Sequence, residues 1–156
     1  MTGHDILKLA GDLFLRNPSP NESLCRNVVG RAYYAAFHIA AGFLAKVGLS
    51  EVEVSGRHGP VQDWLIDSGE EKAKKAGLLL RDLYAARRRA DYELTQRRAV
   101  EESQNREFVR SQVELAETIK SLLESCESEP RRTEFLRGIA TLRKHAERGK
   151  KPDEKI

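Results

Sequence analysis

Apolar residues recur at three- and four-residue steps along most of the chain, which is the spacing of helices that bury one face. Ile6, Leu9 and Leu13 predict a first helix that ends at the Asn-Pro-Ser-Pro stretch starting at Asn17. No stretch alternates apolar and polar residues as a strand would. The pattern predicts five further helices: about Pro20–Val47, Pro60–Asp67, one from between Glu70 and Leu78 to near Thr95, Val100–Ser125 and Arg131–Glu147.

The helix predicted at Pro20–Val47 is the longest, and its ends carry clear signals. Ser19 can cap it, with Pro20 at the first helical position and Glu22 three residues after the cap, and Gly48 is expected to end it. Small residues run along it and would let neighbouring helices approach closely: Ala32, Ala35, Ala36, Ala40, Ala41 and Gly42. We therefore expect this helix to lie at the centre of the fold.

Each later helix has an apolar stripe that predicts its buried face. Trp64 is expected to anchor the short helix in the core, after a loop through Ser55 to Gly59 and before a stop at Gly69. The other stripes are Leu79, Leu83, Ala86, Ala90 and Leu94; then Phe108, Leu115, Ile119 and Leu122; and finally Phe135, Leu136, Ile139 and Leu142. We predict an all-α protein, an antiparallel up-and-down helical bundle of four to five helices plus a C-terminal helix.

The 156 residues suit one compact domain, and the balance of 40% hydrophobic and 33% charged residues is that of a globular protein. We expect the bundle at 1–126, the appended C-terminal helix at 127–148 and a disordered tail at 149–156. Two cysteines without a CxxC motif, and a start that lacks a secretory signal, predict a cytoplasmic protein. Charges within the apolar stretch Val28–Leu49 favour a buried helix over a membrane span.

The scattered cysteines and histidines show no metal-ligand spacing, so we expect no metal and no cofactor. The net charge is only +3, but arginines cluster at 87–89, 97–98 and 131–132. Such clusters can bind phosphate, although on helical proteins they are more often solvated or ion-paired.

Polar residues interrupt the apolar central helix on one face. Arg31 and His38 are seven residues apart, or about 10 Å along the helix, and Tyr34 lies between them. Buried polar groups need partners, and Asp91 of the later helix can supply one through an ion pair with Arg31. In that structural interpretation, His38 and Tyr92 are satisfied groups at the edge of the core.

The alternative interpretation is a site for RNA. Arginine would bind phosphate while a histidine exchanges protons near neutral pH, and these two roles can cleave RNA through its 2′-hydroxyl without a metal. His58, in the predicted loop, could supply a second imidazole or could be an exposed or capping residue.

The stretches RAYYAAFHIAAGFL, RHGPV and LLRDLYAARRRADYEL, which contain these residues, resemble the uncharacterised prokaryotic branch of the HEPN domain family. The resemblance runs from about Ile6 to Leu123. It implies an up-and-down bundle, commonly a homodimer, found beside a small nucleotidyltransferase or in toxin–antitoxin and defence systems. The partners that it implies are a nucleotidyltransferase antitoxin and either RNA or a nucleotide. We expect no interaction with a membrane.

The resemblance also implies a metal-independent endoribonuclease in which an arginine and a histidine, with four to six residues between them on a late helix, meet across the dimer. This chain has Asp91 at about the place of that histidine, while Arg31 and His38 match the spacing on the earlier helix. The roles carried over are His38 as acid or base, and Arg31 and Arg87 as phosphate binders. The binding or orienting residues are Tyr34, Arg88, Asp91, Tyr92 and His58.

Two other functions fit the same residues. Asp91 in place of the histidine favours a non-catalytic module that binds a nucleotide, RNA or the partner nucleotidyltransferase, since an aspartate with a pKa of about 4 is a poor proton donor at neutral pH. Tyr92 could then be a modification target. A purely structural bundle, whose polar stripe fixes the helix register, is the third interpretation.

Overall fold

The computed structural model describes residues 1–49 and 58–149, and this part of the chain contains seven helices and no strand. The all-α prediction is therefore confirmed for these residues. The helices are α1 (Gly3–Arg16), α2 (Glu22–Lys46), α4 (His58–Asp67), α5 (Glu71–Tyr92), α6 (Arg97–Gln104), α7 (Arg106–Cys126) and α8 (Arg131–Gly149). The tail predicted at 149–156 lies, apart from its first residue, outside the described part.

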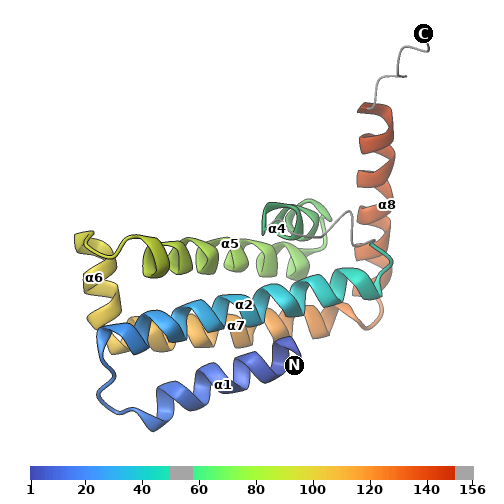
Figure 1. The fold of residues 1–156 in the computed structure, drawn as a ribbon. Helices are drawn as coiled ribbons and strands as arrows, with labels where there is room; N and C mark the ends of the chain where they lie inside the picture. The colour runs from blue at the N-terminus through green and yellow to red at the C-terminus, as the bar shows by residue number, and fades with distance from the viewer. Residues whose placement is uncertain (50–57, 150–156) are drawn as a thin grey trace.

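Helices α1, α2, α5 and α7 lie side by side and form the body of the bundle (Figure 1). The central helix α2 contacts α1, α5 and α7, as its small residues predict. A Cβ added at Gly3 of α1 would lie 2.8 Å from Ile39 Cγ1 and 2.9 Å from the Ala35 carbonyl oxygen, which shows how closely α1 and α2 pack. Helix α4 lies on α5, and α8 stands across one end of the bundle (Figure 1).

The first residues of α2 differ from the prediction. Asn21, and not Ser19, caps the helix, and its side-chain oxygen accepts a hydrogen bond of 2.8 Å from the Leu24 N–H. Glu22 is therefore the first helical residue, and its carboxylate accepts from Arg26 one turn later instead of closing a capping box. An asparagine is as good a cap as a serine, and the later of the two candidate cap residues, which are separated by Pro20, is used here.

The end of α2 agrees with the prediction at Gly48. This glycine has φ of +93°, and its N–H donates to the Ala45 carbonyl while the Leu49 N–H donates to the Leu44 carbonyl. This pair of bonds satisfies the last carbonyls of the helix in the arrangement known as a Schellman motif. Glycine is suited to the position because it has no Cβ to strain at positive φ.

The single helix predicted at Val100–Ser125 is wrong, because two helices, α6 and α7, meet at Asn105. The Asn105 side chain caps α7 by accepting from the Phe108 N–H at 3.1 Å. Ile119 of α7 is fully buried, whereas Phe108, Leu115 and Leu122 are only half-buried. The local capping choice of one asparagine therefore outweighs an uninterrupted helical pattern.

Two predictions around α4 and α5 also need correction. His58 and Gly59 are the first residues of α4 and not part of a loop, while residues 50–57 lie outside the described part. Trp64 packs against the core but is half-buried. Leu94 lies beyond the end of α5 and is 61% exposed, so it does not extend the apolar stripe of that helix.

Helix α8 is attached to the bundle by an apolar and a polar contact. Phe135 and Ile139 are buried, and the Phe135 ring lies 5.0 Å from that of Phe43 in α2. At the polar contact, the fully buried Glu70 accepts from Arg131 Nη1 at 2.8 Å and from the Cys126 thiol at 3.1 Å. These contacts lie where α7 ends and α8 begins.

Helix α2 is the one described helix that is long and apolar enough, by length and composition, to cross a membrane. Half of its most apolar 18-residue segment is buried inside the bundle. The core helix of a soluble protein and a signal sequence near the N-terminus both meet the same criterion, so the finding does not establish a membrane span.

Candidate functional site

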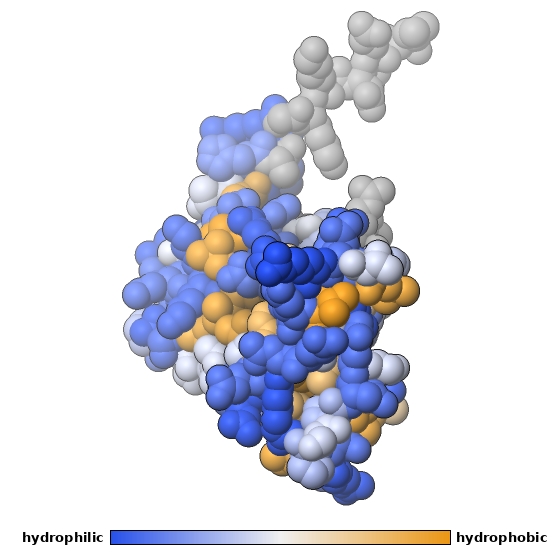
Figure 2. Space-filling view, turned by 90° about the vertical axis from the view of Figure 1, so that its left-hand side faces the viewer, coloured by the Kyte–Doolittle hydropathy of each residue, from blue (hydrophilic) through white to orange (hydrophobic). Residues whose placement is uncertain are grey.

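A groove of about 470 Å³ runs between the first half of α2 and the end of α5. Figure 2 looks toward this end of the molecule, where the surface is mainly hydrophilic and carries separate apolar patches. The groove is lined by Ser23, Arg26, Asn27, Gly30, Arg31, Tyr34, Ala90, Asp91 and Leu94. Arg26 is already engaged there, since it donates to the Ala90 carbonyl at 2.8 Å and pairs with Glu22.

Arg87 is a buried, fixed charge at the edge of this groove. Its Nη2 donates to the Tyr34 hydroxyl at 2.6 Å, and its Nε lies 2.7 Å from Asp91 Oδ2. The guanidinium carbon also lies 5.0 Å from the centre of the Tyr34 ring and 5.4 Å from that of Tyr92. Burial opposes the charge, but Tyr34 and Asp91 outweigh it and raise the pKa of Arg87.

Arg31 is half-buried in the groove and has a different environment. Its side chain has no hydrogen bond or ion pair with any residue in 1–49 or 58–149, and its Nε is shielded from solvent without a partner. The predicted Arg31–Asp91 ion pair is therefore wrong. Asp91 pairs with Arg87 instead, because the two lie one turn apart on α5.

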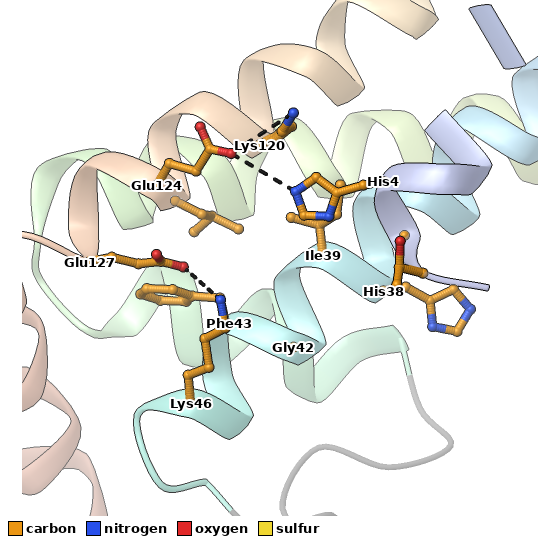
Figure 3. Close-up of a pocket in the computed structure, with 12 residues that line it drawn as sticks. His4, His38, Ile39, Gly42, Phe43, Lys46, Lys120, Glu124 and Glu127 are labelled. Carbon is orange, nitrogen blue, oxygen red and sulfur yellow. Dashed lines mark hydrogen bonds and ion pairs between the residues drawn. The ribbon is translucent and has the colours of Figure 1, made fainter. Parts of the chain in front are cut away.

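His38 is exposed and lies two turns beyond Arg31 along α2. It lines a pocket of about 350 Å³ between α1, α2 and α7, and Figure 3 shows its ring pointing away from Lys46 and Glu127, which pair at 3.2 Å. No hydrogen bond joins His38 to Arg31 or Arg87 within the described residues. The chain therefore brings Arg31, Tyr34, Arg87, Asp91 and Tyr92 together but leaves His38 apart.

The imidazole close to Arg87 is that of His58. Its Nδ1 is hydrogen-bonded to the Tyr33 hydroxyl, and its ring stacks on Tyr84 with the centres 5.0 Å apart. Burial, and secondarily the charge of Arg87, lower the pKa of His58, while burial raises the pKa of Tyr33. Arg88 is exposed, with its guanidinium carbon 6.0 Å from the centre of the Tyr84 ring.

Sequence reasoning missed Tyr33 and Tyr84 as parts of this cluster. One signal was available in the sequence, because the aromatic residues Tyr33 and Phe37 lie one turn apart on α2. In the structure both rings pack against His58. The contact itself depends on how α4 sits on α2 and α5, which the spacing within one helix does not determine.

We expect His58 to make stability depend on pH below about 6.5. The folded pKa is lowered, so between the two pKa values the unfolded chain binds more protons than the native protein, and stability falls as the pH falls through this range. Urea unfolding at a series of pH values should show this loss in the wild type and a flatter profile in His58→Gln. A variant profile as steep as that of the wild type would contradict the assignment.

Comparison with known proteins finds no matching family model, no matching curated protein and no matching solved structure. Within residues 1–49 and 58–149, no group of three or more histidine, cysteine, aspartate or glutamate side chains is placed to hold a metal ion. The polar side chains at the groove are those of arginine, asparagine, serine, tyrosine and aspartate.

Proposed function

We propose that the protein is a HEPN-like up-and-down bundle that binds RNA through its phosphates in the groove between α2 and α5. We further propose that it works in the cytoplasm as a component of a toxin–antitoxin or defence system, with a nucleotidyltransferase antitoxin as partner. The observation that carries the RNA-binding proposal is Arg31, a half-buried arginine that lines the groove and has no partner for its charge among residues 1–49 and 58–149.

An anion in the groove would give the Arg31 guanidinium the acceptor that the described residues do not provide. A phosphate suits it, because a guanidinium can donate two parallel hydrogen bonds to phosphate oxygens. Tyr34 lines the groove and Tyr92 lies beside Arg87, and both are exposed. Aromatic rings of this kind stack on bases with little dependence on sequence. Arg87 lies at the edge of the groove, held by the Tyr34 hydroxyl and by its ion pair with Asp91.

Substitution of Arg31 by alanine tests the proposal. We expect the dissociation constant for a labelled single-stranded RNA to rise about tenfold, which is the equivalent of one charge-assisted hydrogen bond. Fluorescence anisotropy measures the binding, and Arg16→Ala is the matched control, because Arg16 is exposed on α1 without an ion pair in the described residues. If both substitutions weaken RNA binding equally, the effect is a general one of charge, and the proposal that RNA binds in the groove is refuted.

A metal-independent endoribonuclease is the second candidate function, favoured by the exposed imidazole of His38. Arg31, Tyr34 and His38 follow one another along the same side of α2, two turns in all. Because His38 does not reach Arg87 within one chain, this activity needs a second copy to bring the two groups together, and we propose a homodimer for that case.

Incubation of the same protein with RNA in EDTA separates the two candidates. Cleavage that leaves cyclic-phosphate ends, and that is lost in His38→Ala but kept in His145→Ala, would support the nuclease. His145 is a suitable control because it is also exposed and lies on α8. Intact RNA that is nevertheless bound would leave the binding module as the function.

A further inference from the structure

Helix α8 carries a positively charged face that the groove does not account for. The helix rises from the end of the bundle, as Figure 1 shows. Its inner side, which packs against the core, is apolar. Phe135 and Ile139 on this inner side are buried, and Leu142 is half-buried. The opposite side of the helix therefore faces solvent along its whole described length.

Three basic residues occupy this opposite side. Arg137, Lys144 and Arg148 follow at steps of seven and four residues, which places them within about 40° of one another around the helix axis. All three are exposed, and none has a side-chain hydrogen bond or ion pair with another described residue. We define these three residues as the α8 basic face.

The arginines of α6 and the end of α5, unlike those of the α8 basic face, form ion pairs. Arg89 and Arg98 share Glu102, each with Nε 2.9 Å from a carboxylate oxygen, and Arg97 pairs with Glu101 at 2.8 Å. The chain has a net charge of only +3, and the α8 basic face is a local concentration of positive charge, because its three residues form no ion pair with Glu134 or Glu147 of the same helix. It therefore suits a ligand with repeated negative charges.

We infer that the α8 basic face binds the phosphate backbone of RNA, at a surface separate from the groove between α2 and α5. The choice of RNA as ligand rests on the proposed function. The three residues span about 16 Å of helix, a length over which one strand of a nucleic acid presents about five phosphates. Because such contacts read charge and not sequence, this face would hold RNA without selecting it.

The test replaces all three residues with glutamine and measures RNA binding over a range of salt concentrations. A labelled single-stranded RNA of about 20 nucleotides is the probe, long enough to reach both surfaces. Affinity falls as salt rises, and removal of three phosphate contacts should make the slope of log affinity against log salt less negative by about 2. The matched control replaces Lys8, Arg16 and Lys75, which are exposed on α1 and α5, and removes the same charge.

The slope should change in the α8 variant and stay near that of the wild type in the control. Equal changes in both variants, or wild-type binding by the α8 variant, would overturn the inference. So would loss of binding to phosphatidylserine vesicles with RNA binding unchanged, which would assign the face to a membrane. Circular dichroism checks that each variant remains helical.

Arg31→Ala in the same assay separates this inference from the proposed function. If the α8 variant binds RNA more weakly while Arg31→Ala binds like the wild type, the α8 basic face is an RNA-binding surface and the groove is not. The reverse result would assign RNA binding to the groove and not to the α8 basic face. Absence of RNA binding by the wild type would overturn both.

Discussion

Replacement of Glu70 by alanine should lower the free energy of unfolding by about 3 kcal/mol, because a buried charge network and a helix cap are lost together. Glu70 is fully buried, and its Oε2 accepts from the Ala73 N–H at 2.7 Å at the start of α5. Burial opposes its ionisation, but the Ala73 N–H, the Cys126 thiol and Arg131 outweigh it and lower the pKa of Glu70. The substitution leaves these three groups without their acceptor.

Urea unfolding measures the effect as a lower midpoint with an unchanged slope. Glu71→Ala is the matched control, because Glu71 is the next residue, is exposed and lies in the first turn of the same helix. A loss in Glu70→Ala no larger than that of the control would show that the network contributes little. The carboxylate would then serve only to fill the junction.

Replacement of Gly138 by alanine should displace α8 from the bundle. A Cβ at this position would lie 1.7 Å from the Ser68 carbonyl oxygen, so the helix and the backbone after α4 would have to separate by more than 1 Å. Such a shift pulls Phe135 and Ile139 out of close packing, and we expect a loss of about 2 kcal/mol or more in the free energy of unfolding. Urea unfolding and the rate of tryptic cleavage within α8 would both report it.

The matched control for this substitution is Gly42→Ala. Gly42 also lies in a helix, but a Cβ there would have no atom outside its local helix within 4 Å. Alanine should therefore stabilise the protein by about 0.5–1 kcal/mol through its higher helix propensity. If Gly138→Ala also stabilised the protein and left α8 resistant to trypsin, the close contact with Ser68 would be refuted.

The helices could be predicted because each buries a continuous apolar stripe, but their ends depend on local competition. Ser19 and Asn21 are both good caps, and Asn105 offers a cap inside a sequence that otherwise reads as one helix. The spacing of apolar residues says almost nothing about which cap is used, because the apolar stripe continues on both sides of Asn105. The start of α2 and the junction between α6 and α7 were accordingly the parts that the pattern could not provide.

The candidate site was predicted in part for the same reason. Periodicity indicated that Arg31 and Tyr34 share a face of α2, and that Arg87 and Asp91 share one of α5. It could not determine that Asp91 would pair with Arg87 on its own helix and leave Arg31 without a partner in the described part of the chain, because that depends on the distance between the helices. It likewise could not place His58, whose position is set by the packing of α4.

The buried Glu70 also governs the chemistry of the neighbouring sulfur. Burial and the carboxylate raise the pKa of Cys126 to about 12, so at neutral pH only about one thiol in 10⁵ is ionised. Since the thiolate is the form that oxidants and alkylating agents attack, the folded junction keeps this sulfur unreactive. Once α8 separates from the end of α7, the sulfur gains both solvent and a normal acidity. The rate at which Cys126 is alkylated therefore measures how often this junction opens.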